Sequence, residues 1–303
     1  MLTSRYEDRF VIDDPKKLLT ALRFDLAAKT LYARHREKNA EMFFAKSVYE
    51  HHLDVWGGFT ERLPAKNGVN DFYESFHSVL DNMKTEGFDE EKSFIPVDEN
   101  HLLLNGSHRV ASAIHYQKPV VCKVSPQNAG QLVCTADYFL NKKDIVPSGL
   151  RRDVADAMAL EYIRLKKNVF IASLYQHTFE YMSDIAKVFM ECGASVVYSK
   201  DIVLTDTGKV NYIISAYSDE SWMGNASNGF PGAYNQANLN FAQGGHVRVV
   251  MFECSGLEQA TKIKNQIRQI VGVGKPSVHT TDTPQEAWRN ATIAFHDPTL
   301  KFF

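Results

Sequence analysis

Hydrophobic side chains return at helical spacing along the first part of the chain. After the Asp-Asp-Pro sequence at residues 13–15, leucines recur at roughly helical spacing, as in an amphipathic helix with proline in its first turn. The pattern predicts one helix over residues 15–50 and a second over 70–87, with Gly87 at its C-terminal end. Residues 57–70 are rich in Gly, Pro and Asn and predict a loop between the two helices.

Short apolar runs replace the helical pattern from residue 95 onward. They predict strands over residues 95–97, 102–104 and 119–124, with a short helix over 108–116 between the last two. Residues 141–152 combine clustered charges with one proline and one glycine, and this composition predicts a linker.

The second half of the chain alternates apolar runs with amphipathic stretches. The order strand-helix-strand-helix, with antiparallel returns, fits a ferredoxin-like α/β sandwich. Residues 222–245 are rich in Gly and Asn and predict a long loop, which is either a lid or a disordered segment. The predicted strands are 169–174, 195–199, 247–253 and 277–279, and the predicted helices are 179–192, 210–217, 257–271 and 283–295.

Composition is that of an ordinary globular protein and excludes several functional classes. The chain has 34 Lys and Arg against 36 Asp and Glu, whereas holding nucleic acid by bulk electrostatics needs a basic surface; we expect no nucleic-acid partner. The four cysteines include no CxxC pair, which argues against a zinc site or a disulfide framework. No apolar signal core and no apolar run of about 18 residues is present, so we expect a cytoplasmic protein without a membrane span.

Residues Asn105–Arg109 combine a turn with polar side chains at the start of a predicted helix. Asn105 and Gly106 allow the chain to turn sharply, and free backbone N–H groups at a helix start attract anions. Arg109 would bind a phosphate through two parallel hydrogen bonds, and His108 would donate another. The alternative interpretation is a structural turn followed by a surface arginine.

The sequence LLLNGSHRVASA at residues 102–113 resembles the signature of the ParB/sulfiredoxin-like fold. Members of this fold include chromosome-partition proteins, sulfiredoxins and free-serine kinases, and they bind nucleotides at this turn. The resemblance covers about residues 90–125. It implies that Asn105, Gly106, Ser107, His108 and Arg109 contact the phosphates of a nucleotide.

Two departures from that family's pattern bear on the chemistry. Many members carry Asp before the glycine, where this chain has Asn105. Because an asparagine cannot act as a base, the catalytic carboxylate would lie elsewhere, and Asp98 and Glu99 are the candidates just upstream. Ser107 stands where sulfiredoxin has its reactive cysteine, so we do not expect sulfiredoxin chemistry.

A second candidate site lies at His279, between a predicted short strand and a predicted helix. A histidine in this place is held rigidly, and Thr281 or Asp282 would fix its tautomer so that one ring nitrogen becomes nucleophilic. The alternative is that Asp282 or Thr283 caps the helix and His279 packs in the core.

The sequence around His279 resembles the nucleoside diphosphate kinase segment that contains the phosphorylated histidine, and earlier apolar runs match that family in order over residues 168–297. The resemblance implies a ferredoxin-like domain in which His279 accepts a phosphoryl group. The family's lysine, asparagine and glycine at three positions are replaced by Leu174, Pro276 and Thr280. The domain therefore has either the same fold with a changed substrate or a binding role only.

Arg23, Asp25 and Lys29 form a charged group near the N-terminus. Asp25 and Lys29 are four residues apart, the spacing of an ion pair on a helix surface, and such pairs stabilise a helix by only about 0.2–0.5 kcal/mol. The alternative is that these residues contact a substrate.

These features predict an α+β chain of two domains. Residues 1–145 would form a ParB/sulfiredoxin-like nucleotide-binding domain with N-terminal helices, and residues 146–303 a nucleoside diphosphate kinase-like ferredoxin-fold domain. Two phosphate-competent domains predict a nucleotide-dependent small-molecule kinase or phosphotransferase, with ATP or another NTP as donor and Mg²⁺ bridging phosphate oxygens. In this hypothesis His279 accepts the phosphoryl group or acts as a general base, and the charge is offset by Arg248, Arg268 and Lys275.

The acceptor and the oligomeric state follow from resemblance alone. The two-part pattern is similar to that of chains found beside bacterial surface-polysaccharide enzymes, which implies a sugar, polyol or amino-alcohol acceptor. Ferredoxin-like domains of this family usually assemble, which implies a homo-oligomer. The alternative function is a non-catalytic nucleotide-binding switch of the ParB type.

Overall fold

The computed structural model describes residues 9–36, 38–62, 64–125, 133–142 and 148–296, and it shows the mixed helix and sheet content expected of an α+β protein. Contacts between residues divide the chain into two units, 1–162 and 163–303. The division comes later than the expected boundary at 145/146, because a helix occupies the region after residue 147. Part of the expected linker, residues 143–147, lies outside the described residues.

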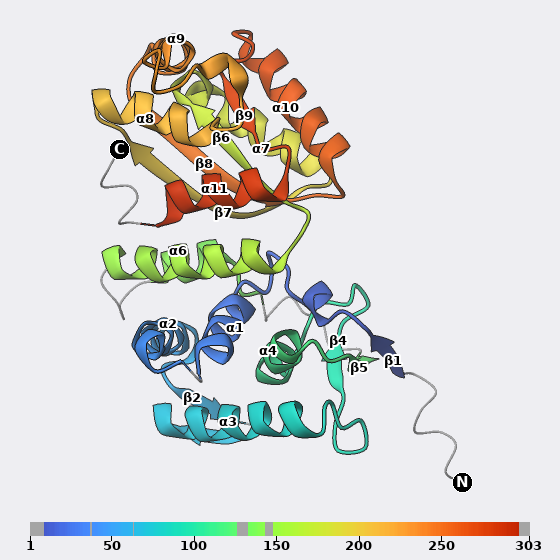
Figure 1. Ribbon diagram of the computed structural model, residues 1–303. Coiled ribbons are helices and arrows are strands. Elements are labelled where there is room, and N and C mark those ends of the chain that lie inside the picture. The colour runs from blue at the N-terminus through green and yellow to red at the C-terminus, as the bar shows by residue number, and fades with distance from the viewer. Residues whose placement is uncertain (1–8, 37, 63, 126–132, 143–147, 297–303) are drawn as a thin grey trace. The chain divides into compact units, whose positions relative to one another are not determined.

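The first unit is built around one central helix, α1 (Asp25–His35). Helices α2 (Asn39–Gly57) and α4 (Ser107–Tyr116) both pack against it, and α3 (Val69–Thr85) packs on α4 (Figure 1). The aromatic core between these helices includes Tyr32, Tyr49 and Phe76, each almost fully buried. The unit also contains α5 (Ala136–Asn141) and most of α6 (Ser148–Leu165).

A small sheet at the other side of α4 completes the first unit. Its strands are β1 (Arg9–Ile12), β5 (Val120–Val124) and β4 (Ile95–Val97), in that order, with β5 antiparallel to β1 and parallel to β4. Helix α4 connects the two parallel strands, so the turn before α4 lies close to the end of β4. This connection therefore determines where residues Asn105–Arg109 lie, at the start of α4 and near the end of β4.

Three local expectations for the first unit were wrong. The single helix over 15–50 is a 3₁₀ turn (Pro15–Leu18) followed by α1 and α2, because the Phe24 N–H donates to the distant Cys134 carbonyl rather than continuing a helix. The loop over 57–70 contains a hairpin of β2 (Thr60–Arg62) and β3 (Ala65–Asn67). Residues 102–104 make only an isolated bridge, between Leu103 and Val97.

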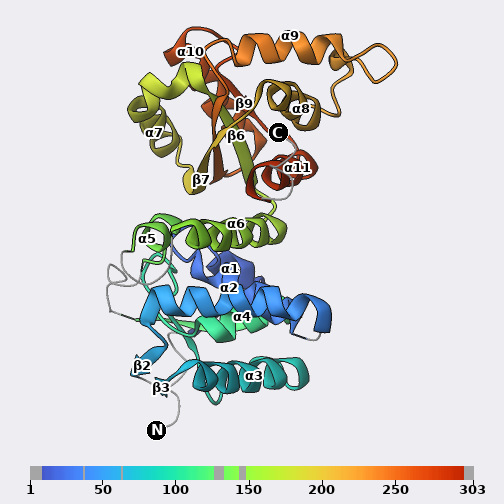
Figure 2. The same ribbon diagram turned by 90° about the vertical axis from the view of Figure 1, so that its left-hand side faces the viewer.

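The second unit has a four-stranded antiparallel sheet in the order β7-β8-β6-β9. Figure 2 shows helices α7 and α10 on one side of this sheet and α8 and α11 on the other. The strands are β6 (Val169–Tyr175), β7 (Ser195–Val203), β8 (His246–Glu253) and β9 (Val278–Thr280). The helices are α7 (Met182–Glu191), α8 (Asp206–Ala216), α9 (Pro231–Asn240), α10 (Leu257–Val271) and α11 (Pro284–Phe295).

The Gly- and Asn-rich segment 222–245 was expected to be a loop but contains helix α9. Pro231 occupies the first turn of this helix, where its fixed backbone and missing N–H are tolerated. Gly232 packs directly on the Trp222 carbonyl, at a place where a β-carbon would lie 2.0 Å from that oxygen. The small residues of the segment therefore permit close packing. Within the described ranges, no helix of either unit has the length and apolar character needed to cross a membrane.

Candidate functional site

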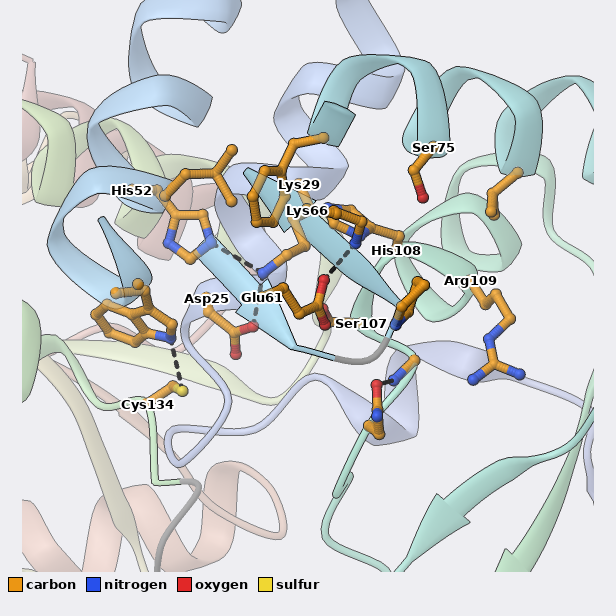
Figure 3. Close-up of a pocket in the computed structure, with 18 of the residues that line it drawn as sticks. Asp25, Lys29, His52, Glu61, Lys66, Ser75, Ser107, His108, Arg109 and Cys134 are labelled. Carbon is orange, nitrogen blue, oxygen red and sulfur yellow. Dashed lines mark hydrogen bonds and ion pairs between the residues drawn. The ribbon is translucent and has the colours of Figure 1, made fainter. Parts of the chain in front are cut away.

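The first unit contains a cavity of about 550 Å³ beside the start of α4 (Figure 3). Its wall is formed by α1, α2, the β2–β3 hairpin, α3 and the turn before α4. The cavity brings together two groups that are about eighty residues apart in sequence. These groups are Arg23, Asp25 and Lys29 on one side and Asn105–Arg109 on the other.

The turn before α4 has the geometry expected of an anion-binding helix start. Gly106 has a φ of 88°, a left-handed conformation that favours glycine, and the Asn105 side-chain oxygen accepts a hydrogen bond from its N–H at 2.6 Å. The first hydrogen bond of the helix runs from the Val110 N–H to the Gly106 carbonyl. The N–H groups of the first turn therefore have no partner within the helix and are available to an anion.

Arg109 lies over this turn. A β-carbon on Gly106 would come within 2.8 Å of the Arg109 Nη2 atom, so the guanidinium rests against the glycine. Its Nη1 donates to the Phe94 carbonyl at 3.0 Å. Burial lowers the pKa of Arg109, and among the residues that the structure describes no carboxylate is paired with it. Arg109 therefore places a positive charge at the N-terminus of α4.

Arg23, Asp25 and Lys29 were expected to lie on the surface as an ion pair or to contact a substrate, and the structure buries all three. Their exposed fractions are 5%, 1% and 4%, because α2 and α4 cover helix α1. The Asp25 Oδ1 atom accepts from Arg23 Nε at 2.8 Å, and Oδ2 accepts from Lys29 Nζ at 2.8 Å. Burial would raise the pKa of Asp25, but Arg23 and Lys29 outweigh it and hold that pKa far below its usual range.

Two histidines of the cavity are neutral. His52 is fully buried, and its Nε2 accepts a hydrogen bond from Lys29 Nζ at 2.8 Å. Burial, reinforced by Lys29, holds the pKa of His52 well below 6.5. His108 meets the Tyr49 hydroxyl at 2.8 Å, and burial likewise lowers its pKa. Neither ring adds positive charge at neutral pH, and neither neutralises the cations.

Sequence reasoning missed the residues that the β2–β3 hairpin brings to the cavity. Glu61 and Lys66 are directly opposite each other on the two strands and form an ion pair. The Lys66 ammonium also lies 4.6 Å from the centre of the Phe72 ring. The segment was expected to be a loop, and three-residue strands of mixed polarity leave no alternating pattern that would reveal a hairpin.

The ionisable side chains of the cavity leave an excess of positive charge. Of the residues that the structure describes, four cationic side chains and two carboxylates line it, and each carboxylate is already paired with at least one cation. The two histidines are neutral. The cations are Arg23, Lys29, Lys66 and Arg109, and the carboxylates are Asp25 and Glu61. Uncompensated buried charge is unfavourable, so the cavity is suited to an anionic ligand.

Asp98 and Glu99, the expected catalytic carboxylates, do not line this cavity. The Asp98 side chain accepts hydrogen bonds from the N–H groups of Asn100 and Leu102, at 2.9 and 2.7 Å, and so stabilises the turn after β4. Glu99 is exposed on that turn. Their residue types fit a turn as well as a base, and only the tertiary structure separates the two interpretations.

In the second unit, His279 lies on edge strand β9 and is 9% exposed. Its Nε2 contacts the Glu286 Oε1 atom at 2.8 Å, and its ring lies 4.2 Å from the Tyr217 ring. Glu286, rather than Thr281 or Asp282, therefore orients the imidazole. The Thr283 side chain caps α11 by accepting from the Glu286 N–H, as the packing alternative expected. A phosphoryl-acceptor role for His279 stays a prediction.

The three cations expected around His279 differ in where the structure places them. Arg248 pairs with Leu174 across the sheet, and Leu174 pairs with Val278, so these three side chains share one face. His279 follows Val278 along β9, so its side chain lies on the other face. It is bound to Asp201 through two contacts of 2.6 Å. Arg268 donates to the Val278 carbonyl, and Lys275 is exposed in the loop before β9.

In comparisons with known proteins, no protein-family model and no curated protein matched this chain. No group of three or more His, Cys, Asp or Glu side chains in the described part of the chain is arranged to hold a metal ion. In the cavity both oxygens of Asp25 are occupied by Arg23 and Lys29.

Proposed function

We propose that the first unit binds a nucleotide by its phosphates and transfers a phosphoryl group to a small molecule. The observation that carries the proposal is the excess of buried positive charge in a cavity that opens on a helix N-terminus. A phosphate bears the charge that this cavity lacks, and it accepts hydrogen bonds from both backbone N–H groups and guanidinium groups. Two cations that are shielded from water would stabilise the charge of a transferring phosphoryl group.

The residues of the turn and of α1 have different roles in this proposal. The N–H groups of the first turn of α4, together with Arg109, bind the terminal phosphate. Lys29 and Arg23 stabilise its charge from the other side of the cavity, and Asp25 holds these two cations in place. His52 accepts a hydrogen bond from Lys29 and thereby fixes the direction of the ammonium group.

The arrangement of elements supports the two finer fold assignments. The β4–α4–β5 connection with its glycine turn has the order that the ParB/sulfiredoxin-like resemblance implies. The antiparallel order β7-β8-β6-β9, with helices on both faces of the sheet in the second unit, is compatible with a ferredoxin-like domain. The role of the second unit in the reaction, through His279 or as a scaffold, is a separate proposal.

A binding experiment tests the nucleotide site. We expect ATP to bind the full chain, and we expect Arg109→Ala to weaken binding by about 10- to 100-fold, because a hydrogen bond to a charged group contributes about 1.5–3 kcal/mol. Lys118→Ala is the matched control, since it removes a cation from the exposed region just beyond the far end of the same helix. Isothermal titration calorimetry would measure both affinities.

The outcomes separate the two candidate functions. Transfer of label from γ-labelled ATP to glycerol, D-glucose or ethanolamine supports the phosphotransferase. ATP binding that depends on Arg109, without transfer to any of the three acceptors, supports the non-catalytic switch instead. If ATP does not bind, or if Arg109→Ala and Lys118→Ala bind it equally well, the phosphate site is not at this turn.

A further inference from the structure

The β2–β3 hairpin brings to the cavity a carboxylate that has a free oxygen. Of the two carboxylates that line the cavity, Asp25 uses both oxygens to bind Arg23 and Lys29. Glu61 uses only Oε2, which accepts from Lys66, and no residue in the described part of the chain hydrogen-bonds its Oε1. Figure 3 shows its carboxylate directed into the cavity.

The position of Glu61 is held from two directions. Lys66 is its cross-strand partner in the hairpin, and the ammonium of Lys66 is in turn held over the Phe72 ring of α3. The Lys66 side chain is 6% exposed, whereas that of Glu61 is 34% exposed. The lysine thus anchors a carboxylate that remains accessible to a ligand.

We propose that Glu61 is the general base of the phosphoryl transfer and that the acceptor is an uncharged hydroxyl compound. This proposal rests on the nucleotide site proposed above. The Glu61–Lys66 pair has no net charge and its ammonium lies over the Phe72 ring, so this part of the cavity does not favour a charged acceptor. The positive charge lies instead at Arg109 and around Asp25, where the phosphates would bind.

The step balances with ATP as the only co-reactant. The acceptor oxygen forms a bond to the γ-phosphorus, while the bond from that phosphorus to the β,γ-bridging oxygen breaks. The bridging oxygen retains the electron pair of the broken bond and leaves as part of ADP. The proton of the acceptor hydroxyl passes to Oε1 of Glu61, which has no competing partner among the described residues.

Substitution of Glu61 separates binding from chemistry. Glu61→Gln retains the size of the side chain and its hydrogen bond with Lys66, so we expect ATP affinity within about threefold of the unsubstituted chain. Transfer of label to glycerol, the uncharged probe acceptor, should fall by about 10²- to 10⁴-fold, the usual contribution of a general base. Glu74→Gln, on the exposed side of α3, is the control and should leave both quantities unchanged.

Chemical rescue distinguishes a base from a structural residue. Sodium formate should restore part of the transfer activity of Glu61→Ala, because the truncated side chain leaves space for an external carboxylate, but it should not restore Glu61→Gln. If Glu61→Gln transfers label as fast as the unsubstituted chain, or if formate restores nothing in Glu61→Ala, Glu61 is not the base, while the nucleotide site still stands. If the unsubstituted chain binds no ATP or transfers none of its label, the proposed function fails and this proposal fails with it.

Discussion

Asp25 lies in a very different environment from the one that its sequence spacing predicts. The spacing of Asp25 and Lys29 is that of a surface ion pair, yet both are almost fully buried and Asp25 binds Arg23 as well. Two cations around one carboxylate leave a net positive charge inside the protein. An uncompensated buried charge is unfavourable, so an anion that binds beside these residues would be stabilised by them.

Removing the Asp25 carboxylate should be strongly destabilising. Asp25→Asn leaves Arg23 and Lys29 buried without a counter-charge, and breaking such a group costs about 3–5 kcal/mol. Asp81→Asn is the control, because Asp81 pairs with Arg36 at the surface, where an ion pair contributes about 0–1 kcal/mol. Urea denaturation would measure both free energies of unfolding. Similar losses of stability in the two variants would contradict the burial of Asp25 between Arg23 and Lys29.

The start of α4 is the element on which the candidate site depends. Its position results from a short strand, a left-handed glycine and a helix that packs against α1. The glycine turn was predictable from the Asn-Gly pair, since few other residues adopt a positive φ. That Arg109 rests against Gly106 was not predictable, because it depends on the Phe94 carbonyl that accepts its hydrogen bond.

Gly106→Ala should affect both stability and binding. The positive φ alone costs an alanine about 1–2 kcal/mol, and the new methyl group would displace the Arg109 guanidinium. We therefore expect a lower melting temperature together with weaker ATP binding. Gly57→Ala is the stability control, since nothing lies within 4 Å of its β-carbon position and its φ is not positive. If Gly106→Ala melts at the same temperature as Gly57→Ala, the turn does not have this conformation.

At the scale of the whole molecule, the two units contain titratable groups that respond to different pH ranges. In the first unit, His52 and His108 are held neutral by burial, with pKa values well below 6.5. In the second unit, burial would raise the pKa of Glu286, but its contact with His279 outweighs this effect, so that pKa lies below 4.5. The stability that depends on the two histidines therefore begins to fall at a higher pH than the stability that depends on Glu286.

Acidification should accordingly destabilise the first unit before the second. Below pH 6.5 both histidines are protonated in the unfolded chain but not in the folded chain. The free energy of unfolding therefore decreases as the pH decreases, by at most about 1.4 kcal/mol per pH unit for each histidine. The contribution of Glu286 is present above pH 4.5 and is lost only as pH falls through its lowered pKa.

Tryptophan fluorescence can follow each unit separately. Trp56 lies in the first unit, whereas Trp222 and Trp288 lie in the second. Urea denaturation of the Trp222→Phe/Trp288→Phe variant at pH 7.5 and 5.5 should show a clear loss of stability reported by Trp56, and His52→Gln should reduce that loss. A transition of the Trp56 reporter that does not change between the two pH values would show that the histidines are not buried in neutral form.

Features that depend on local chemistry could be predicted from the amino-acid sequence. These are the mixed helix and strand content, the strands of the second half, the glycine turn before α4 and a cap of α11 at Asp282 or Thr283, of which the structure shows Thr283. Which charges share a cavity depends instead on how distant segments meet in the fold. Arg23, Asp25 and Lys29 lie far from Arg109 in sequence, and Glu61 lies in a segment without a clear pattern, yet all of them line one cavity. Burial, pairing and net charge are properties of residues that meet across the fold, so periodicity along the chain does not contain them.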